Sequence, residues 1–133
     1  MATYVSTWKS NLFEVNYVDK FKDVMENVFG FEVVSDKNKV QLYYNELNSP
    51  PFEIDKGAGI PKWNELIDEF EDDYVDLPTV ISKFLKEDEK AIVKEVGNEK
   101  LRYVVGFAFA VNSDGKCITL NLNEIESRAE NEL

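Results

Sequence analysis

Residues 100–123 read KLRYVVGFAFAVNSDGKCITLNLN, and they predict the β-hairpin around which the fold is built. The first half, 100–112, is a long and mostly apolar stretch, typical of a central strand. Gly106 within it suits a bulge or a close packing point. Asn, Ser, Asp and Gly at 112–115 favour a tight turn. The second half, 116–123, alternates, with Cys117, Thr119 and Asn121 on one face and Ile118, Leu120 and Leu122 on the other.

Further strands are predicted where apolar and polar residues alternate or where β-branched and aromatic residues gather. They are 10–15, 31–35, 40–46 and 90–96. The residues at 36–39, Asp-Lys-Asn-Lys, are expected to join the second and third of these as a hairpin turn. The stretch 47–61 contains three Pro and two Gly. We expect it to be a loop without regular structure, since proline interrupts both helices and central strands.

Helices are predicted where apolar residues recur at helical spacing, at 19–30, 62–76 and 77–89. Gly30 suits the position just past the end of the first helix. Asp76 is the expected N-cap of the third, and Pro78 lies in its first turn, where its missing N–H does no harm. The buried stripe of that helix is expected to be Leu77, Val80, Ile81, Phe84 and Leu85. A short acidic helix is expected to follow Asn123 as its cap.

The element order predicts the fold class. Strands and helices do not alternate strictly, so we expect an α+β protein with a mostly antiparallel sheet of five to six strands and helices packed on one face. A chain of 133 residues suits a single domain over 1–133.

Several chemistries are excluded by composition. The chain has no histidine, which removes His-based triads and His-ligated zinc, and its one cysteine, Cys117, cannot build a thiolate metal site. The stretch 56–62, KGAGIPK, matches neither a P-loop nor a dinucleotide-binding turn, and 36–46 lacks the glycine of a calcium loop. We therefore predict no cofactor and no metal. A carboxylate-metal enzyme remains an alternative, with Glu65 and Glu69, or Asp68 and Asp72, holding Mg²⁺.

The net charge of −11 decides which partners are compatible. Nucleic acids and anionic membranes attract Lys and Arg, so we expect no direct contact with either. A basic protein partner is compatible with this charge, and so is a surface that is acidic only for solubility. Residues 1–15 show no secretory signal and no apolar run reaches membrane-spanning length, so a cytoplasmic location is expected.

The acidic charge is concentrated in ELIDEFEDDYVD, residues 65–76, which holds seven acidic and no basic side chains. On a helix the stretch divides into an apolar face and a carboxylate face, and like charges four residues apart each destabilise it by about 0.2–0.5 kcal/mol. Such a locally unfavourable feature is typical of a binding site. The candidate partner-binding residues are Glu65, Asp68, Glu69, Asp72, Asp73 and Asp76. A solvated acidic face is the alternative interpretation.

Neighbouring residues extend this hypothesis. Carboxylates about 5–6 Å apart along a helix resemble phosphate spacing and can compete for a nucleic-acid groove. Two further acidic groups can enlarge the field, at 87–89 and at 124–132. Phe52 and Trp63 are candidate aromatic anchors, with ordinary core packing as the alternative for both.

The segments NEKLRYVVGFAFAVNSDGKCITLNLNEI (98–125) and TWKSNLFEV (7–15) also carry a resemblance. Together they cover about a third of the chain and resemble an uncharacterised family of small acidic bacterial proteins carried on mobile elements. The shared pattern is a Glu-Lys-Leu-Arg-Tyr run, a Gly-aromatic-Ala-x-Ala-Val-Asn strand, a Gly turn and a final acidic helix. It has no catalytic signature, so the resemblance implies no site residues.

These observations favour a non-enzymatic inhibitor, borne by a phage or plasmid, that occupies a basic nucleic-acid-binding site of a host defence protein. An immunity protein against a basic toxin is a second hypothesis, and the carboxylate-metal enzyme and an inert scaffold are further alternatives. The oligomeric state is left open by the sequence.

Overall fold

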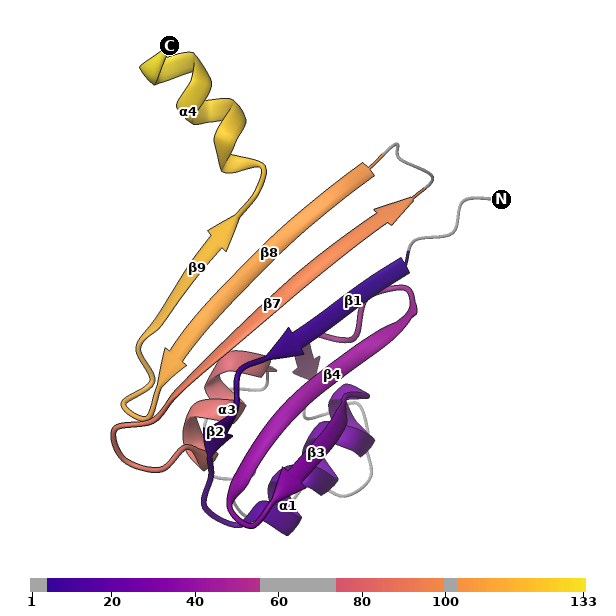
Figure 1. The fold of residues 1–133 in the computed structure, drawn as a ribbon, viewed down its shortest axis with the longest axis vertical. Coiled ribbons are helices and arrows are strands. Elements are labelled where there is room, and N and C mark those ends of the chain that lie inside the picture. The colour runs from indigo at the N-terminus through magenta and orange to yellow at the C-terminus, as the bar shows by residue number, and fades with distance from the viewer. Residues whose placement is uncertain (1–4, 56–73, 100–102) are drawn as a thin grey trace.

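Seven strands form one antiparallel sheet in a computed structural model that describes residues 5–55, 74–99 and 103–133 (Figure 1). The strands of this sheet are β1 (Val5–Ser10), β2 (Phe13–Glu14), β3 (Glu32–Asp36), β4 (Lys39–Leu47), β7 (Lys90–Glu99), β8 (Tyr103–Asn112) and β9 (Cys117–Asn121). Their order is β2-β4-β1-β7-β8-β9, and β3 also pairs with β4. The predicted α+β class is confirmed, with one or two more strands than expected.

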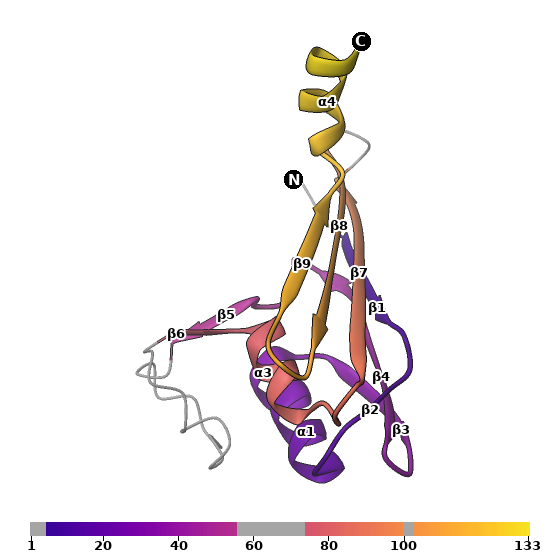
Figure 2. The ribbon, with the colours of Figure 1, turned by 90° about the vertical axis from the view of Figure 1, so that its left-hand side faces the viewer.

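The remaining elements are a second, two-stranded sheet and the helices. The small sheet pairs β5 (Glu53–Asp55) with β6 (Tyr74–Asp76). The helical elements are α1 (Val18–Val24), the π-helical turn η1 (Met25–Phe29), α3 (Leu77–Phe84) and α4 (Glu124–Glu132). In Figure 2 the main sheet is seen nearly edge-on, with α1, α3 and the β5–β6 pair all on one side of it. The prediction of helices on one face therefore holds for α1 and α3.

The hairpin predicted from 100–123 is present, but β8 is not the centre of the sheet. Ten residue pairs join β7 to β8, from Lys90↔Asn112 to Glu99↔Tyr103, and five join β8 to β9. Gly115 has a φ of 88° in the turn, a conformation that glycine adopts without strain. Within the described chain β9 has no neighbour on its outer side, so β8 lies next to the edge while β1 and β7 lie at the centre.

The predicted first strand at 10–15 is wrong in its bounds, because the chain bends in its middle. β1 begins at Val5 and ends at Ser10, and β2 follows after a break at Asn11 and Leu12. At this break, hydrogen bonds from side chains replace the backbone pairing of the sheet. The Ser10 hydroxyl accepts the N–H of Leu42 at 2.8 Å, and the Asn11 side-chain oxygen accepts the N–H of Ile92 at 2.8 Å. These bonds let one segment pair with β4 on both sides of the bend.

The predicted helix at 19–30 and the hairpin that follows it are confirmed. Gly30 ends the helical turn η1 with a φ of 80°, as expected for the residue just past a helix. β3 and β4 then pair antiparallel, with Asp36 opposite Lys39 across the turn. The helical spacing also identified the buried residues Phe21, Val24, Met25 and Val28.

The predicted helix at 77–89 is confirmed at its start and is too long at its end. Asp76 caps it and Pro78 lies in its first turn. The helix ends at Phe84 because Leu85 turns to an extended conformation and forms a bridge with Val15. The five residues of the predicted stripe are all buried.

The predicted loop at 47–61 contains more regular structure than expected. β4 continues through Leu47, and β5 follows directly after the two prolines at 50 and 51, where pairing with β6 supplies its backbone partners. The rest of that segment, 56–61, lies outside the described residues.

The core fills the space between the main sheet and the helices α1 and α3. Phenylalanines form much of it, with edge-to-face contacts between Phe13 and Phe21 at 5.8 Å and between Phe21 and Phe84 at 5.4 Å. The opposite face of the sheet, called the outer face below, is covered by neither α1 nor α3 (Figure 2). A bare face of this kind is normally polar in an antiparallel sheet.

Candidate interaction surfaces

The predicted acidic helix falls mostly outside the described residues. Glu65, Asp68, Glu69, Asp72 and Asp73 belong to the segment 56–73, so the structure places none of them. Asp76 is described, and it corrects the prediction, because Tyr74–Asp76 is strand β6 and not the end of a helix. The backbone of Asp76 is extended, at φ −93° and ψ 161°, since a residue that caps α3 cannot also be helical.

Asp76 has a structural role that accounts for its carboxylate. Its Oδ1 accepts the backbone N–H of Thr79 at 2.9 Å, which satisfies one of the free donors at the start of α3. The residue is half-buried, while its neighbour Tyr74, predicted on the apolar face of a helix, is 59% exposed. Asp76 therefore acts as the N-cap of α3.

The two ends of the acidic segment lie side by side. Asp55 pairs with Tyr74 across β5 and β6, so the chain leaves for 56–73 and returns from it at neighbouring positions. Residues 53–76 hold nine acidic and two basic side chains, a net charge of −7 out of the −11 of the whole chain. We call this region, β5 to β6, the acidic arm. In Figure 2 its two strands extend away from the sheet on the side of the helices.

The two predicted aromatic anchors have different outcomes. Phe52 packs edge-to-face against Phe107 and Phe109, with ring centroids 5.9 Å apart in both pairs. It therefore belongs to the core, which was the alternative interpretation, because the loop before β5 folds back over the inner face of β8. Trp63 lies outside the described residues.

A second surface, which the sequence interpretation missed, lies on the outer face of β7, β8 and β9. Along β7 the buried side chains alternate with exposed ones, and cross-strand partners share a face. Apart from Lys90 and Lys94, the outward set in the middle of these strands is apolar and includes Ile92, Val96, Ala108, Ala110, Ile118 and Leu120. Ile118 is 73% exposed and Leu120 64%. The alternation along 116–123 predicted which side chains share this face. It did not predict that α1 and α3 would both pack on the other face of the sheet.

The C-terminal helix α4 is a third exposed element. It continues from β9 and projects beyond the end of the sheet (Figure 1), and none of its residues is buried. The expected cap is wrong: Asn123 makes no side-chain cap, and instead its N–H donates to Oδ1 of Asn121 at 3.0 Å. The start of the helix lines a hollow on the sheet, but with nine residues the helix is shorter than the about 12–15 that an isolated helix needs to be stable in water.

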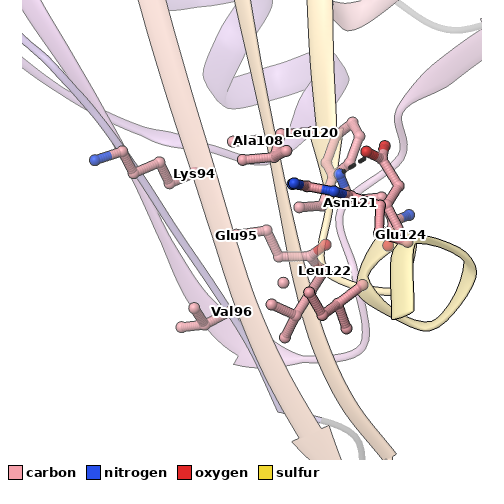
Figure 3. Close-up of a pocket in the computed structure, with 12 residues that line it drawn as sticks. Lys94, Glu95, Val96, Ala108, Leu120, Asn121, Leu122 and Glu124 are labelled. Carbon is pink, nitrogen blue, oxygen red and sulfur yellow. Dashed lines mark hydrogen bonds between the residues drawn. The ribbon is translucent and has the colours of Figure 1, made fainter. Parts of the chain in front are cut away.

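A hollow lies where α4 begins, against the outer face, with a volume of about 390 Å³. Lys94, Val96, Ala108, Leu120 and Leu122 are among its lining residues (Figure 3), and α4 contributes Ile125 and Arg128. The backbone of β8 comes close to the chain here, because Gly106 has no side chain and an added Cβ would lie 3.1 Å from the Cβ of Leu122. The predicted close packing point at Gly106 is therefore confirmed, and its ladder with β7 shows no bulge.

The described chain also holds a buried carboxylate that the sequence interpretation missed. Glu95 on β7 is 7% exposed, and its Oε2 accepts the hydroxyl of Ser6 at 2.7 Å. That hydroxyl in turn accepts the indole N–H of Trp8 at 2.7 Å. Glu95 follows Ala91 and Val93 at steps of two, so strict alternation along 90–96 could have placed it inside. Its hydrogen bonds are those of a satisfied core network.

The thiol of Cys117 lies on β9 and is unpaired. Partial desolvation by the surrounding chain and, to a smaller degree, the negative charge of Asp76 raise the pKa of this thiol above its ordinary value. A raised pKa reduces the thiolate fraction of Cys117 at neutral pH.

No group of three or more His, Cys, Asp or Glu side chains that could hold a metal ion occurs within the described residues. The proposed Mg²⁺ ligands at 65–72 fall outside them. In the same described ranges, no helix is both long and apolar enough to cross a membrane. Comparison with protein-family models, with curated proteins and with solved structures finds no match to this chain.

Proposed function

We propose that this protein is a non-enzymatic binding module whose acidic arm occupies a basic, nucleic-acid-binding site on a partner protein. The observation that supports this most is the position of the charge. The arm carries a net charge of −7, and the pairing of Asp55 with Tyr74 keeps both ends of that charged segment together at one place on the molecule. An anionic region of this kind attracts cationic surfaces and accelerates encounter with them.

The chemistry of the arm suits a site built for phosphates. A nucleic-acid-binding site gathers Lys and Arg to neutralise phosphate groups, and closely spaced carboxylates present the same charge to it. The setting we propose is the inhibition of a host defence protein by a phage- or plasmid-borne chain. Binding of this type weakens as salt rises, because exposed charges are screened over about 8 Å at physiological ionic strength.

The test compares two variants with equal net charge. The first removes three of the nine negative charges of the arm, with Glu69→Gln, Asp72→Asn and Asp73→Asn, and leaves Asp76 in place because it caps α3. The matched control neutralises three exposed acidic side chains outside the arm, with Glu26→Gln, Glu32→Gln and Asp36→Asn.

Each protein is used to capture partners from a bacterial lysate, and the captured proteins are identified by mass spectrometry. We expect wild type and control to retain a basic nucleic-acid-binding protein that added DNA or RNA displaces, and the arm variant to lose it. Retention of the same protein by the arm variant at physiological salt would show that the acidic arm is not the binding surface. A captured toxin without nucleic-acid-binding activity would favour the immunity protein instead.

A further inference from the structure

We propose that the protein forms a homodimer in which α4 of each copy packs on the outer face of β7, β8 and β9 of the other. The starting point is that two apolar surfaces of one chain both lack a cover. In α4, Ile125, Ala129 and Leu133 follow each other at steps of four residues and form a single stripe. Ile125 is 60% exposed and Leu133 is fully exposed, although α4 has too few residues to persist without packing.

The outer face has the shape that a helix needs. Between Gly106 and Ala110 the middle strand, β8, presents Gly106, Ala108 and Ala110 outward, whereas larger side chains stand on the strands at either side. These larger side chains are Ile92 and Val96 on β7, and Ile118 and Leu120 on β9. Adjacent strands lie about 4.8 Å apart, so the two rows are separated by about 10 Å, close to the diameter of a helix. The result is a shallow apolar groove, called the β8 groove below.

Charge complements this fit. Lys90 and Lys94 point outward from β7 beside the groove, and Lys9 on β1 lies opposite Lys94. Two lysines facing each other across strands repel, and Lys94 makes no ion pair within the described residues. On α4, Glu126 and Glu130 flank the apolar stripe. A helix seated in the β8 groove therefore places the carboxylates of α4 beside Lys90 and Lys94.

Two hydrogen bonds hold the start of α4 at the end of its own sheet. The N–H of Leu122 donates to the carbonyl of Gly106 at 2.7 Å, and that of Asn121 donates to the Glu124 carboxylate at 3.2 Å. These contacts direct α4 away from the sheet (Figures 1 and 2). Ile125 at its start lines the hollow beside Val96 and Ala108 of its own chain, whereas the rest of the helix projects beyond the sheet, where a second molecule can meet the stripe.

Exchange of α4 between two copies is self-complementary. Each copy offers one helix and one groove, so a two-fold axis satisfies both and closes the assembly as a dimer. The unpaired edge of β9 is brought near the dimer axis, where it is protected from unlimited strand addition. The acidic arm extends from the opposite side of the sheet (Figure 2), so the dimer leaves it free, and this inference stands independently of the proposed function.

The experiment is sedimentation equilibrium of the full chain over a range of concentrations, since the chain mass of 15.3 kDa separates monomer from dimer clearly. Ile125→Asp places a charge in the helix stripe, and Ala108→Glu blocks the groove. Both positions are off the core, so the fold is retained, as circular dichroism will check. The matched control, Val34→Asp, changes another exposed apolar side chain on the outer face, on β3.

We expect wild type and Val34→Asp to be dimers. Each of the other two variants should raise the dimer dissociation constant at least about a hundredfold, because a loss of about tenfold occurs at each of two symmetric contacts. Mixing Ile125→Asp with Ala108→Glu leaves one contact intact and places both substitutions in the other, so the heterodimer should form in preference to either variant homodimer and bind more weakly than wild type. A monomeric wild type, a dimer that survives Ile125→Asp, or a mixture without heterodimer would each overturn the proposal.

Discussion

Replacement of Asp76 by alanine tests whether this residue acts as a helix cap or as part of a charged surface. The variant loses the oxygen that accepts the N–H of Thr79 at 2.9 Å, so this N–H loses its capping partner. Loss of an N-cap lowers the free energy of unfolding by about 1 kcal/mol. In a domain of this size that corresponds to a fall of about 3–5 °C in Tm.

Asp76→Asn separates the cap from the charge. Asparagine keeps a side-chain oxygen in the same place and is an equally good N-cap, so we expect a loss of only a few tenths of a kcal/mol. Glu53→Gln is the matched control, because Glu53 lies opposite Asp76 in the β5–β6 ladder. This substitution removes one negative charge at the same place and leaves the N-cap of α3 intact. It should be neutral or slightly stabilising, since two like charges face each other there.

The measurement is urea unfolding followed by circular dichroism. The slope of the unfolding free energy against urea concentration, the m-value, checks that the unfolded state is unchanged. The reasoning fails if Asp76→Ala and Asp76→Asn are destabilised equally, because the negative charge and not the cap would then account for the effect. It fails also if alanine is without effect, since α3 would then begin without help from this side chain.

Three further predictions concern the core, a helix end and the thiol. Ser6→Ala removes the hydroxyl between Trp8 and Glu95 and should lower the free energy of unfolding by about 1–3 kcal/mol; an unchanged urea midpoint would show that the network re-forms without it. Gly30→Ala should destabilise the protein by about 1 kcal/mol, because alanine is strained at the φ of 80°. No steric clash adds to this cost, since an added Cβ meets no atom within 4 Å. Thermal unfolding of this variant at the wild-type Tm would contradict that. Cys117 should react with iodoacetamide more slowly than free cysteine at neutral pH and faster as the pH rises, because its pKa is raised. A pH-independent rate, or a rate above that of free cysteine, would refute the stated cause.

Local patterns in the sequence identified most of the elements. Helical spacing located 19–30 and the start of 77–89, and the glycines at 30 and 115 marked the ends of a helix and a turn, where both have positive φ. These signals are local because a helix buries one face at a fixed period and a tight turn needs specific residues.

The misassigned segments were those in which distant residues supply the backbone partners. Tyr74–Asp76 continued a helical pattern, yet pairing with Glu53–Asp55 makes it a strand. The break at Asn11 depends on hydrogen bonds to β4 and β7, which lie 30 to 80 residues away in the chain. The early end of α3 depends on the bridge between Leu85 and Val15. No local propensity encodes such partners.

The sequence by itself determined the α+β class, the hairpin of β8 and β9, the acidic character of residues 53–76 and the lack of histidine chemistry, because composition and periodicity are properties of the chain alone. The tertiary structure alone decided which apolar surfaces stay uncovered. Ile118 and Leu120 alternate along β9 as core residues do, and they are exposed because α1 and α3 pack on the other face of the sheet. Alternation defines two faces of a strand, whereas burial depends on what else the chain brings against each of them.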